Sequence, residues 1–417
     1  MLDLLLRNVH LPEGRTVDIS IEKGIVVHAG AGGRADSTLE CSEFLVLPGG
    51  VDMHVHMRGG SRESRKEDWG TGSRSALAGG VTLAVDQPNT NPPLTTVEAL
   101  QARIGEAGRD SLCHFAVNAG VVPGADLPGL HRAGAMAFGE IFLGASTGAK
   151  GVSGGVLGPL LSGIHALGTT ATLHAEEVHE ADDTDLVSHD ASRPQEGEIR
   201  AIGKVKSRTP KGMLLHFCHL STAGALAAAA PHTTEVTPHH LLLSREDFPK
   251  DDPRGKVNPP LRSATEREGL LAAWNRVTVL ASDHAPHTRE EKAGEFSRAP
   301  AGVPGVETMI PLMIPRVLSG EMTPASLIEK TSGNPCRILG IPVPGFSGGH
   351  RADFALYPRE ITTIRARDLH SRCGWTPFEG RQAVFPDIVI LGGEEVLREG
   401  DFTRGNPRWF PGRGYHP

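Results

Sequence analysis

The residues best suited to chemistry lie in segment 49–58, directly after the apolar run 44–47. An apolar run that ends in alternating polar residues predicts a buried strand, and a period of two sends His54 and His56 to the same face at its C-terminal end. Two adjacent imidazoles suit Zn²⁺ or a similar ion, if other segments supply carboxylates or further histidines. The competing interpretation is that both rings serve packing alone.

The composition is that of an ordinary globular protein, with 39% hydrophobic and 22% charged residues among 417. A net charge of -7 argues against nucleic acid or an anionic membrane as a partner and favours a small ligand. The five cysteines are scattered without CxxC spacing, and no apolar stretch reaches the length of a membrane span. We therefore expect a cytoplasmic protein with no disulfide framework.

The elements that must position the histidines form a repeating pattern. From residue 49 onward, short apolar runs alternate with helix-like segments, which is typical of β/α units and a parallel sheet. Eight such runs predict a (β/α)8 TIM-like barrel. The runs are 45–56, 81–86, 113–119, 135–143, 170–174, 213–219, 234–238 and 277–283, and helices are expected at 66–78, 96–107, 195–207, 222–230 and 264–275.

Polar residues gather at one end of these runs. Catalytic groups of such barrels lie at the C-terminal ends of the strands, whereas packing histidines would show no such preference. The pattern therefore favours a site at the barrel mouth. Its members are His54 and His56 ending run one, Asn89 after run two, Glu140 in run four, His174 ending run five, His219 ending run six and Asp283 ending run eight.

Both ends of the chain read differently from its centre. Residues 1 to about 48 and the stretch after the helical segments 306–318 and 324–339 predict short strands separated by Gly and Pro. We predict a small β-sandwich from residues 1–49 and 346–417 and a barrel from residues 50–345. The aromatic tail 406–411 is expected to dock on this sandwich and, less favoured, on a partner.

The motifs around these residues resemble dihydroorotase, a cyclic-amide hydrolase of the amidohydrolase superfamily. The HxH motif alone is shared across that superfamily, but the set is specific and runs from about residue 45 to 380. It comprises DMHVHMR (52–58), QPNTNPP (87–93), HAE (174–176), CHLST (218–222), VTPHH (236–240), KVNPPLR (256–262), SDHAPH (282–287), GNP (333–335) and CGWTPFEG (373–380).

The resemblance implies a metal centre. His54 and His56 would hold one metal and His174 and His219 a second, while Asp283 would bind metal and handle the proton of the water. One or two cations would bring the pKa of that water toward neutrality. Asp283 would then take its proton and pass it to the leaving ring nitrogen, as base and then acid.

Two positions in this ligand set leave alternatives. His216 competes with His219, but residues three apart on a strand face opposite sides, and the HLS resemblance favours His219. Most relatives carry a bridging lysine, carbamylated by CO2, where this chain has Glu140. We hypothesise that Glu140 is itself a metal ligand. The alternatives are a site with a single metal, or a nearby residue such as Lys150 that takes the place of the bridging lysine. No carbamylated lysine is expected, and Zn²⁺ is the default ion, although Mn or Co suits the same ligands.

The substrate-binding residues also follow from the resemblance. It assigns Arg58, Asn89 and His287 to a substrate carboxylate, for which a guanidinium is the natural partner. Hydantoinases and allantoinases usually lack this arginine, so Arg58 discriminates among the cyclic amidohydrolases. Asn258 and the loop with Gly302 would line the ring. The sequence departs from the family after Arg58, where Gly59-Gly60 replaces the common Glu-Pro-Gly.

The activity that the resemblance implies is the metal-dependent, reversible cyclisation of N-carbamoyl-L-aspartate to (S)-dihydroorotate, with water release, in de novo pyrimidine (UMP) biosynthesis. One alternative is another cyclic amidohydrolase, an allantoinase or hydantoinase. A second is an inactive scaffold for aspartate transcarbamoylase, which the complete ligand set disfavours. A homodimer is expected, with association to aspartate transcarbamoylase as a further option.

Overall fold

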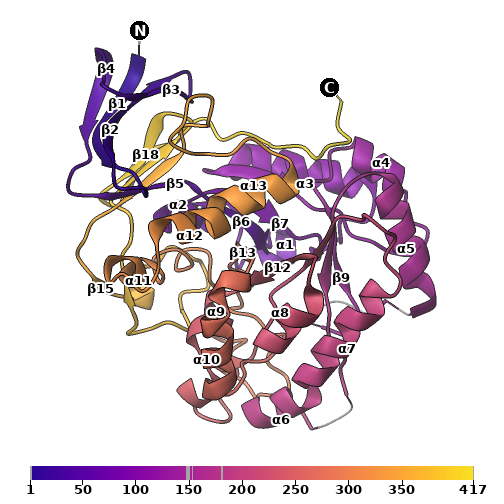
Figure 1. Cartoon of the computed structure of the whole chain (residues 1–417). Coiled ribbons are helices and arrows are strands. Elements are labelled where there is room, and N and C mark those ends of the chain that lie inside the picture. Colours follow the sequence, from indigo (N-terminus) through magenta and orange to yellow (C-terminus); the bar gives the residue numbers. More distant parts are fainter. Residues whose placement is uncertain (1, 147–150, 153, 180–181, 417) are drawn as a thin grey trace.

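Parallel strands form a closed barrel in the computed structural model, which describes residues 2–146, 151–152, 154–179 and 182–416 (Figure 1). The order is β6-β7-β8 in one sheet and β9-β10-β11-β12-β13 in the other. Bridges between Ala119 and Phe138 and between Val55 and His284 join the two sheets. The predicted fold class is confirmed. The strands are β6 (Gly50–Val55), β7 (Val81–Asp86), β8 (His114–Val117), β9 (Phe138–Phe142), β10 (Ala171–His174), β11 (Leu215–Phe217), β12 (Thr233–Val236) and β13 (Val279–Leu280).

Helices surround the barrel, and several begin at caps that the sequence encodes. The side chains of Asp68, Thr96 and Thr222 each accept a backbone hydrogen bond from the first turn of the helix that follows. These helices are α2 (Trp69–Ala78), α3 (Val97–Asp110) and α8 (Ala223–Ala229). The others are α1 (Gly60–Glu63), α4 (Leu127–Arg132), α5 (Gly154–Ala166), α6 (Leu186–Ser192), α7 (Gln195–Lys206), α9 (Pro238–Leu242), α10 (Ala264–Ala272), α11 (Ile314–Leu318), α12 (Pro324–Ile328) and α13 (Asn334–Leu339), with short helical turns η1 (Arg245–Asp247), η2 (Pro253–Gly255), η3 (Trp274–Arg276) and η4 (Glu329–Gly333).

Strands from the two ends of the chain lie side by side in a β-sandwich at the upper left of Figure 1. Leu6, Ile19, Val46, Phe354 and Ile390 belong to one buried cluster that both sheets share. One sheet contains β1 (Leu2–His10), β2 (Thr16–Glu22), β3 (Ile25–Gly30) and β4 (Ala35–Glu40), and the other contains β5 (Leu45–Pro48), β14 (Phe354–Tyr357), β17 (Ile388–Leu391), β18 (Glu394–Arg398) and β19 (Asp401–Phe402). A separate pair, β15 (Thr362–Thr363) with β16 (Gln382–Ala383), and the turn η5 (Ala366–Asp368) follow β14.

The predicted run 45–56 is two strands rather than one. The amide of Gly49 donates to Asp353 beside the sandwich strand β14, whereas the amide of Gly50 donates to Gly80 at the start of the barrel strand β7. The hydrogen-bonding partner therefore changes between consecutive residues. Strand β4 is polar and mostly exposed.

The prediction for the aromatic tail was wrong for its aromatic residues, which lie on the barrel, while the side chain of Asn406 donates to Glu394 of the sandwich strand β18. The amide of Phe115 in β8 donates to Arg408, and the amide of Phe410 donates back to Phe115. The Phe410 ring lies 5.4 Å from the ring of His114 and 4.8 Å from the Arg351 guanidinium. Strand β9 begins further along the barrel than Phe115, so the edge of β8 is unpaired at this residue and the tail occupies it.

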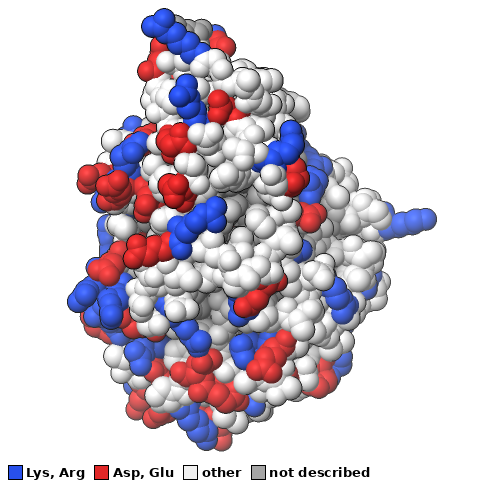
Figure 2. All heavy atoms as spheres, turned by 60° about the vertical axis from the view of Figure 1, so that its left-hand side comes forward, with Lys and Arg blue, Asp and Glu red and all other residues white. Residues whose placement is uncertain are grey.

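On the face shown in Figure 2, basic and acidic side chains are interspersed, and the described residues there form no continuous basic patch. Within the described ranges, no helix combines the length and the apolar character that crossing a membrane requires.

Candidate metal centre

The predicted site residues meet at the C-terminal ends of the barrel strands. His56 and Asp283 lie closest together on one side, with 3.1 Å between Nε2 and Oδ1. The buried ring of His54 lies beside them, its Nε2 3.5 Å from the same Asp283 oxygen. One cavity is lined by nine of the predicted residues, namely His56, Arg58, Asn89, Glu140, His174, His219, Asn258, Asp283 and Gly302.

Glu140 lies among three imidazoles. Its Oε1 is 2.6 Å from Nε2 of His219 and 3.1 Å from Nδ1 of His174, and its Oε2 is 3.5 Å from Nε2 of His54. Strand β9 therefore places the Glu140 carboxylate within reach of all three rings. Lys150, the alternative source of a carbamate, lies outside the described residues.

A β-bulge explains how Glu140 reaches the centre. Between Phe138 and Ile141, strand β9 carries two residues where its partner β10 carries only Thr172. A bulge of this kind re-aims side chains and is common beside active sites. Gly139 has a φ of +127°, and a Cβ there would lie 2.2 Å from the Thr172 carbonyl oxygen, so only glycine fits.

Three site residues have left-handed backbone conformations, which are uncommon outside glycine. Arg58, His219 and Asp283 have φ values of 47°, 33° and 45°. Such conformations cost about 1–3 kcal/mol each and persist where the surrounding structure holds them. All three lie two or three residues past the end of a barrel strand, where the backbone turns and directs these side chains into the mouth.

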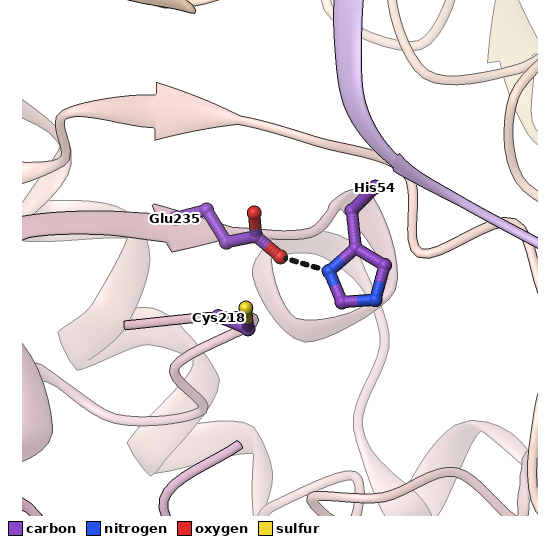
Figure 3. Close-up of side chains that lie close together, drawn as sticks. All are labelled: His54, Cys218 and Glu235. Carbon is purple, nitrogen blue, oxygen red and sulfur yellow. Dashed lines mark hydrogen bonds and ion pairs between the residues drawn. The ribbon is translucent and has the colours of Figure 1, made fainter. Parts of the chain in front are cut away.

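The second nitrogen of three site imidazoles is held by a polar partner. His54 Nδ1 lies 2.6 Å from Glu235, as Figure 3 shows, and His56 Nδ1 lies 2.8 Å from Oδ1 of Asn89. His174 Nε2 lies 2.7 Å from Glu176, which also accepts from Arg193. Partners of this kind fix the tautomer and orientation of a metal-binding histidine.

Sequence reasoning gave Glu235 no role, although it stands in the seventh run directly before the recognised VTPHH motif. The sequence did contain a signal for Glu235, since it is a lone carboxylate within an apolar run. A charge buried in this way needs a partner, which indicates a specific role. His216, the rival of His219, is buried away from the cavity, with its Nε2 3.0 Å from Glu235.

The donor set fits a divalent cation. Burial opposes charge on His54, but the carboxylates of Glu235, Glu140 and Asp283 together raise its pKa well above the ordinary value. Burial likewise opposes ionisation of Asp283, yet nearby imidazoles hold the pKa of that carboxyl well below its usual range. His54 therefore carries a proton among these carboxylates, at a position where a metal cation could replace it. Nε2 of His54 has no hydrogen-bond partner among the described residues. The ligand atoms of His54 lie close to those of His56 and Asp283, and they also lie close to those of Glu140 and His219.

Four of the five residues predicted for substrate, Arg58, Asn89, Asn258 and Gly302, line the same cavity, and the fifth, His287, lies outside its lining but contacts Arg58. Arg58 is half-buried, donates from Nε to the Pro286 carbonyl, and has no carboxylate in ion-pair contact within the described part of the chain. Its Nη2 lies 3.4 Å from Nε2 of His287, whose pKa burial lowers to about 3. Asn258 donates to Ser146 at the rim. An unpaired guanidinium thus stands beside a neutral imidazole.

Comparisons with known proteins agree with this arrangement. A family model described as dihydro-orotase-like matches residues 44–148. The chain is 38% identical over 405 residues to a dihydroorotase of Halobacterium salinarum, with 94% of this chain and 96% of the relative covered. It is 36% identical over 453 residues to a dihydroorotase of Methanosarcina mazei, with 99% of each covered.

Among solved structures, an L-hydantoinase from Arthrobacter aurescens matches with a TM-score of 0.91 and 26% identity, over 99% of this chain and 100% of that one. A D-hydantoinase matches with a TM-score of 0.88 at 21% identity over 99% of each chain, which concerns the fold alone. The full-length sequence relatives decide the family. The chain belongs to the dihydroorotase family of metal-dependent cyclic amidohydrolases.

Proposed function

We propose that this chain catalyses the reversible cyclisation of N-carbamoyl-L-aspartate to (S)-dihydroorotate with release of water, the dihydroorotase step of de novo pyrimidine biosynthesis. The observation that carries the proposal is the unpaired guanidinium of Arg58 in the cavity that His56 and Asp283 also line. Both substrates carry a carboxylate, which an arginine binds by paired hydrogen bonds. The relatives named dihydroorotase support the same reaction.

The metal centre in this proposal uses His54, His56, Glu140, His174, His219 and Asp283. Imidazole and carboxylate ligands suit Zn²⁺, and one or two ions are expected. Because Glu140 already supplies a carboxylate between the imidazoles, no carbamylated lysine is needed. A bound divalent cation would lower the pKa of a water molecule and polarise the amide oxygen.

Asp283 carries the proton transfer. Its carboxylate is ionised, because neighbouring imidazoles hold its pKa well below the usual range. In the hydrolytic direction it accepts a proton from the attacking water and delivers it to the leaving ring nitrogen. In the cyclising direction the same carboxylate takes the proton from the attacking carbamoyl nitrogen and delivers it to the departing hydroxide, which leaves as water.

Three side chains bind the substrate carboxylate and hold the ring. Arg58 supplies the charge, Asn89 supplies its amide nitrogen, and the neutral ring of His287 adds a polar contact. Asn258 and the backbone at Gly302 line the ring, where a Cβ on residue 302 would approach the Ala285 carbonyl oxygen to 2.7 Å. The charged contact with Arg58 thus holds the substrate in the geometry that ring closure requires.

A substrate comparison on purified protein tests the proposal. Dihydroorotate, allantoin and hydantoin are assayed with the wild type and with Arg58→Met. We expect turnover of dihydroorotate alone, and in the variant a loss in kcat/KM of about 10- to 100-fold, since a hydrogen bond to a charged group contributes about 1.5–3 kcal/mol. Preferred turnover of hydantoin or allantoin, untouched by the substitution, would overturn it. Wild-type protein that binds metal and turns over none of these would support a scaffold role.

Two further features stay predictions within this proposal. A homodimer in the cytoplasm is expected, with aspartate transcarbamoylase as an optional partner. Light scattering of the purified protein alone, and of its mixture with that enzyme, measures both associations.

A further inference from the structure

Glu235 is a buried carboxylate that accepts hydrogen bonds from three groups around the metal centre. Its Oε1 lies 2.6 Å from Nδ1 of His54 and 3.0 Å from the backbone nitrogen of His219, and its Oε2 lies 3.0 Å from Nε2 of His216. The side chain is only 1% exposed. Glu235 comes from β12, which pairs with β11 and β13, so its contact with His54 on β6 crosses the barrel interior.

The contact with His54 fixes which ring nitrogen faces the centre. A carboxylate oxygen only accepts, so Nδ1 of His54 carries the hydrogen. When a cation replaces the proton on Nε2, the lone pair lies on that nitrogen, which points toward Glu140 and Asp283 at 3.5 Å from each. The ring is thereby held in the tautomer and orientation that a metal ligand requires.

An alternative for the same residues is a metal ion between His54, Cys218 and Glu235, whose donor atoms lie close together (Figure 3). Nitrogen and oxygen atoms that both bind a tetrahedral Zn²⁺ at ordinary lengths lie roughly 3.3 Å apart. The separation of 2.6 Å between His54 and Glu235 is shorter and is that of a charge-assisted hydrogen bond. The geometry therefore favours a hydrogen bond and not a third metal site.

We propose that Glu235 is a positioning residue of the metal centre that orients His54 through its ring and His219 through its backbone. The inference rests on the metal centre proposed above. Because one carboxylate contacts residues assigned to different metals, its loss weakens the whole centre and not a single ligand. His216 in turn holds the carboxylate of Glu235, because its Nε2 donates to Oε2, the oxygen that does not contact His54. The other ring nitrogen of His216, Nδ1, lies 3.0 Å from the hydroxyl of Thr233.

The test measures Zn²⁺ affinity by competition with a chromophoric chelator in wild type, Glu235→Ala and Glu235→Gln. Glu235→Ala should bind Zn²⁺ about 10- to 100-fold more weakly, the usual cost of losing such a partner. Glu235→Gln keeps an oxygen for His54 but not the charge, so it should lose less. It also keeps the test valid if the alanine variant fails to fold.

Glu307→Gln is a matched control. Glu307 is also buried and accepts from the ring and the backbone nitrogen of one histidine, His370, at 2.7 and 2.8 Å, but it contacts no residue of the centre. We expect wild-type Zn²⁺ affinity in this variant. The visible absorption of the Co²⁺-loaded proteins should change only in the Glu235 variants, because a ligand whose orientation is lost alters the ligand field.

The outcomes separate the two proposals. Wild-type protein that binds no Zn²⁺ would overturn the metal centre and this inference with it. Normal wild-type binding that both Glu235 variants retain would overturn the inference alone. A thiolate-to-cobalt charge-transfer band, or a lower metal stoichiometry in Cys218→Ser, would also overturn it, because Cys218 would then be a ligand.

Discussion

The ring of His56 donates a hydrogen bond from Nδ1 to Oδ1 of Asn89 over 2.8 Å, so a proposed metal ligand contacts a proposed substrate-binding residue. With its oxygen engaged by His56, the amide of Asn89 is left with its nitrogen for an anionic substrate. Binding of substrate and placement of His56 thus depend on one amide group.

Asn89→Asp is expected to separate these two roles. The carboxylate can still accept from His56, so the metal content should stay at the wild-type level. It repels the substrate carboxylate, however, so KM for dihydroorotate should rise by at least about tenfold, equivalent to about 1.4 kcal/mol. Steady-state kinetics and metal analysis of the same preparation check this. An unchanged KM would show that Asn89 does not face the carboxylate.

Glu140→Ala is expected to lower the bound metal per chain, because Glu140 contacts His54, His174 and His219 at once. Elemental analysis after dialysis gives the metal content. Intact-protein mass spectrometry of wild type in bicarbonate should show no carbamate adduct. Unchanged metal in the variant, or an adduct on Lys150, would contradict a role for Glu140 as ligand.

Gly139→Ala is expected to destabilise the fold and to displace Glu140. The new Cβ would meet the Thr172 carbonyl at 2.2 Å in a backbone conformation that disfavours side chains. We expect a loss of at least about 2 kcal/mol in the free energy of unfolding. Gly203→Ala is the control, since it lies in α7 with open space around it and should be neutral or slightly stabilising. Equal denaturation midpoints for both variants would refute the argument.

Lys292 predicts a pH dependence of stability away from the metal centre. Burial lowers its pKa to about 7, whereas an unfolded lysine side chain has a pKa of about 10.4. Between these values the unfolded chain binds a proton that the folded chain does not, so stability rises with pH. Relative to Lys292→Met, wild type should gain up to about 4 kcal/mol between pH 7 and about 10. Urea denaturation series across that range measure it, and parallel curves would contradict it.

The sequence determined the elements and the residue types of the centre. Period-two alternation placed His54 and His56 on one face, and the rule that catalytic groups follow parallel strands located His174, His219 and Asp283. These are local signals, since strand period and strand end can be read within a few residues. The fold class followed from counting such runs.

Tertiary structure decided which groups touch. Glu235 reaches His54 across the barrel, 181 residues away in sequence, and no local pattern encodes that separation. Glu140 faces the imidazoles because β9 bulges against β10, and the register between two strands is a property of the pair. The aromatic residues of the tail lie on β8 because this strand extends beyond the start of β9, and the stagger between two strands, which decides where an edge stays unpaired, is a property of the assembled barrel.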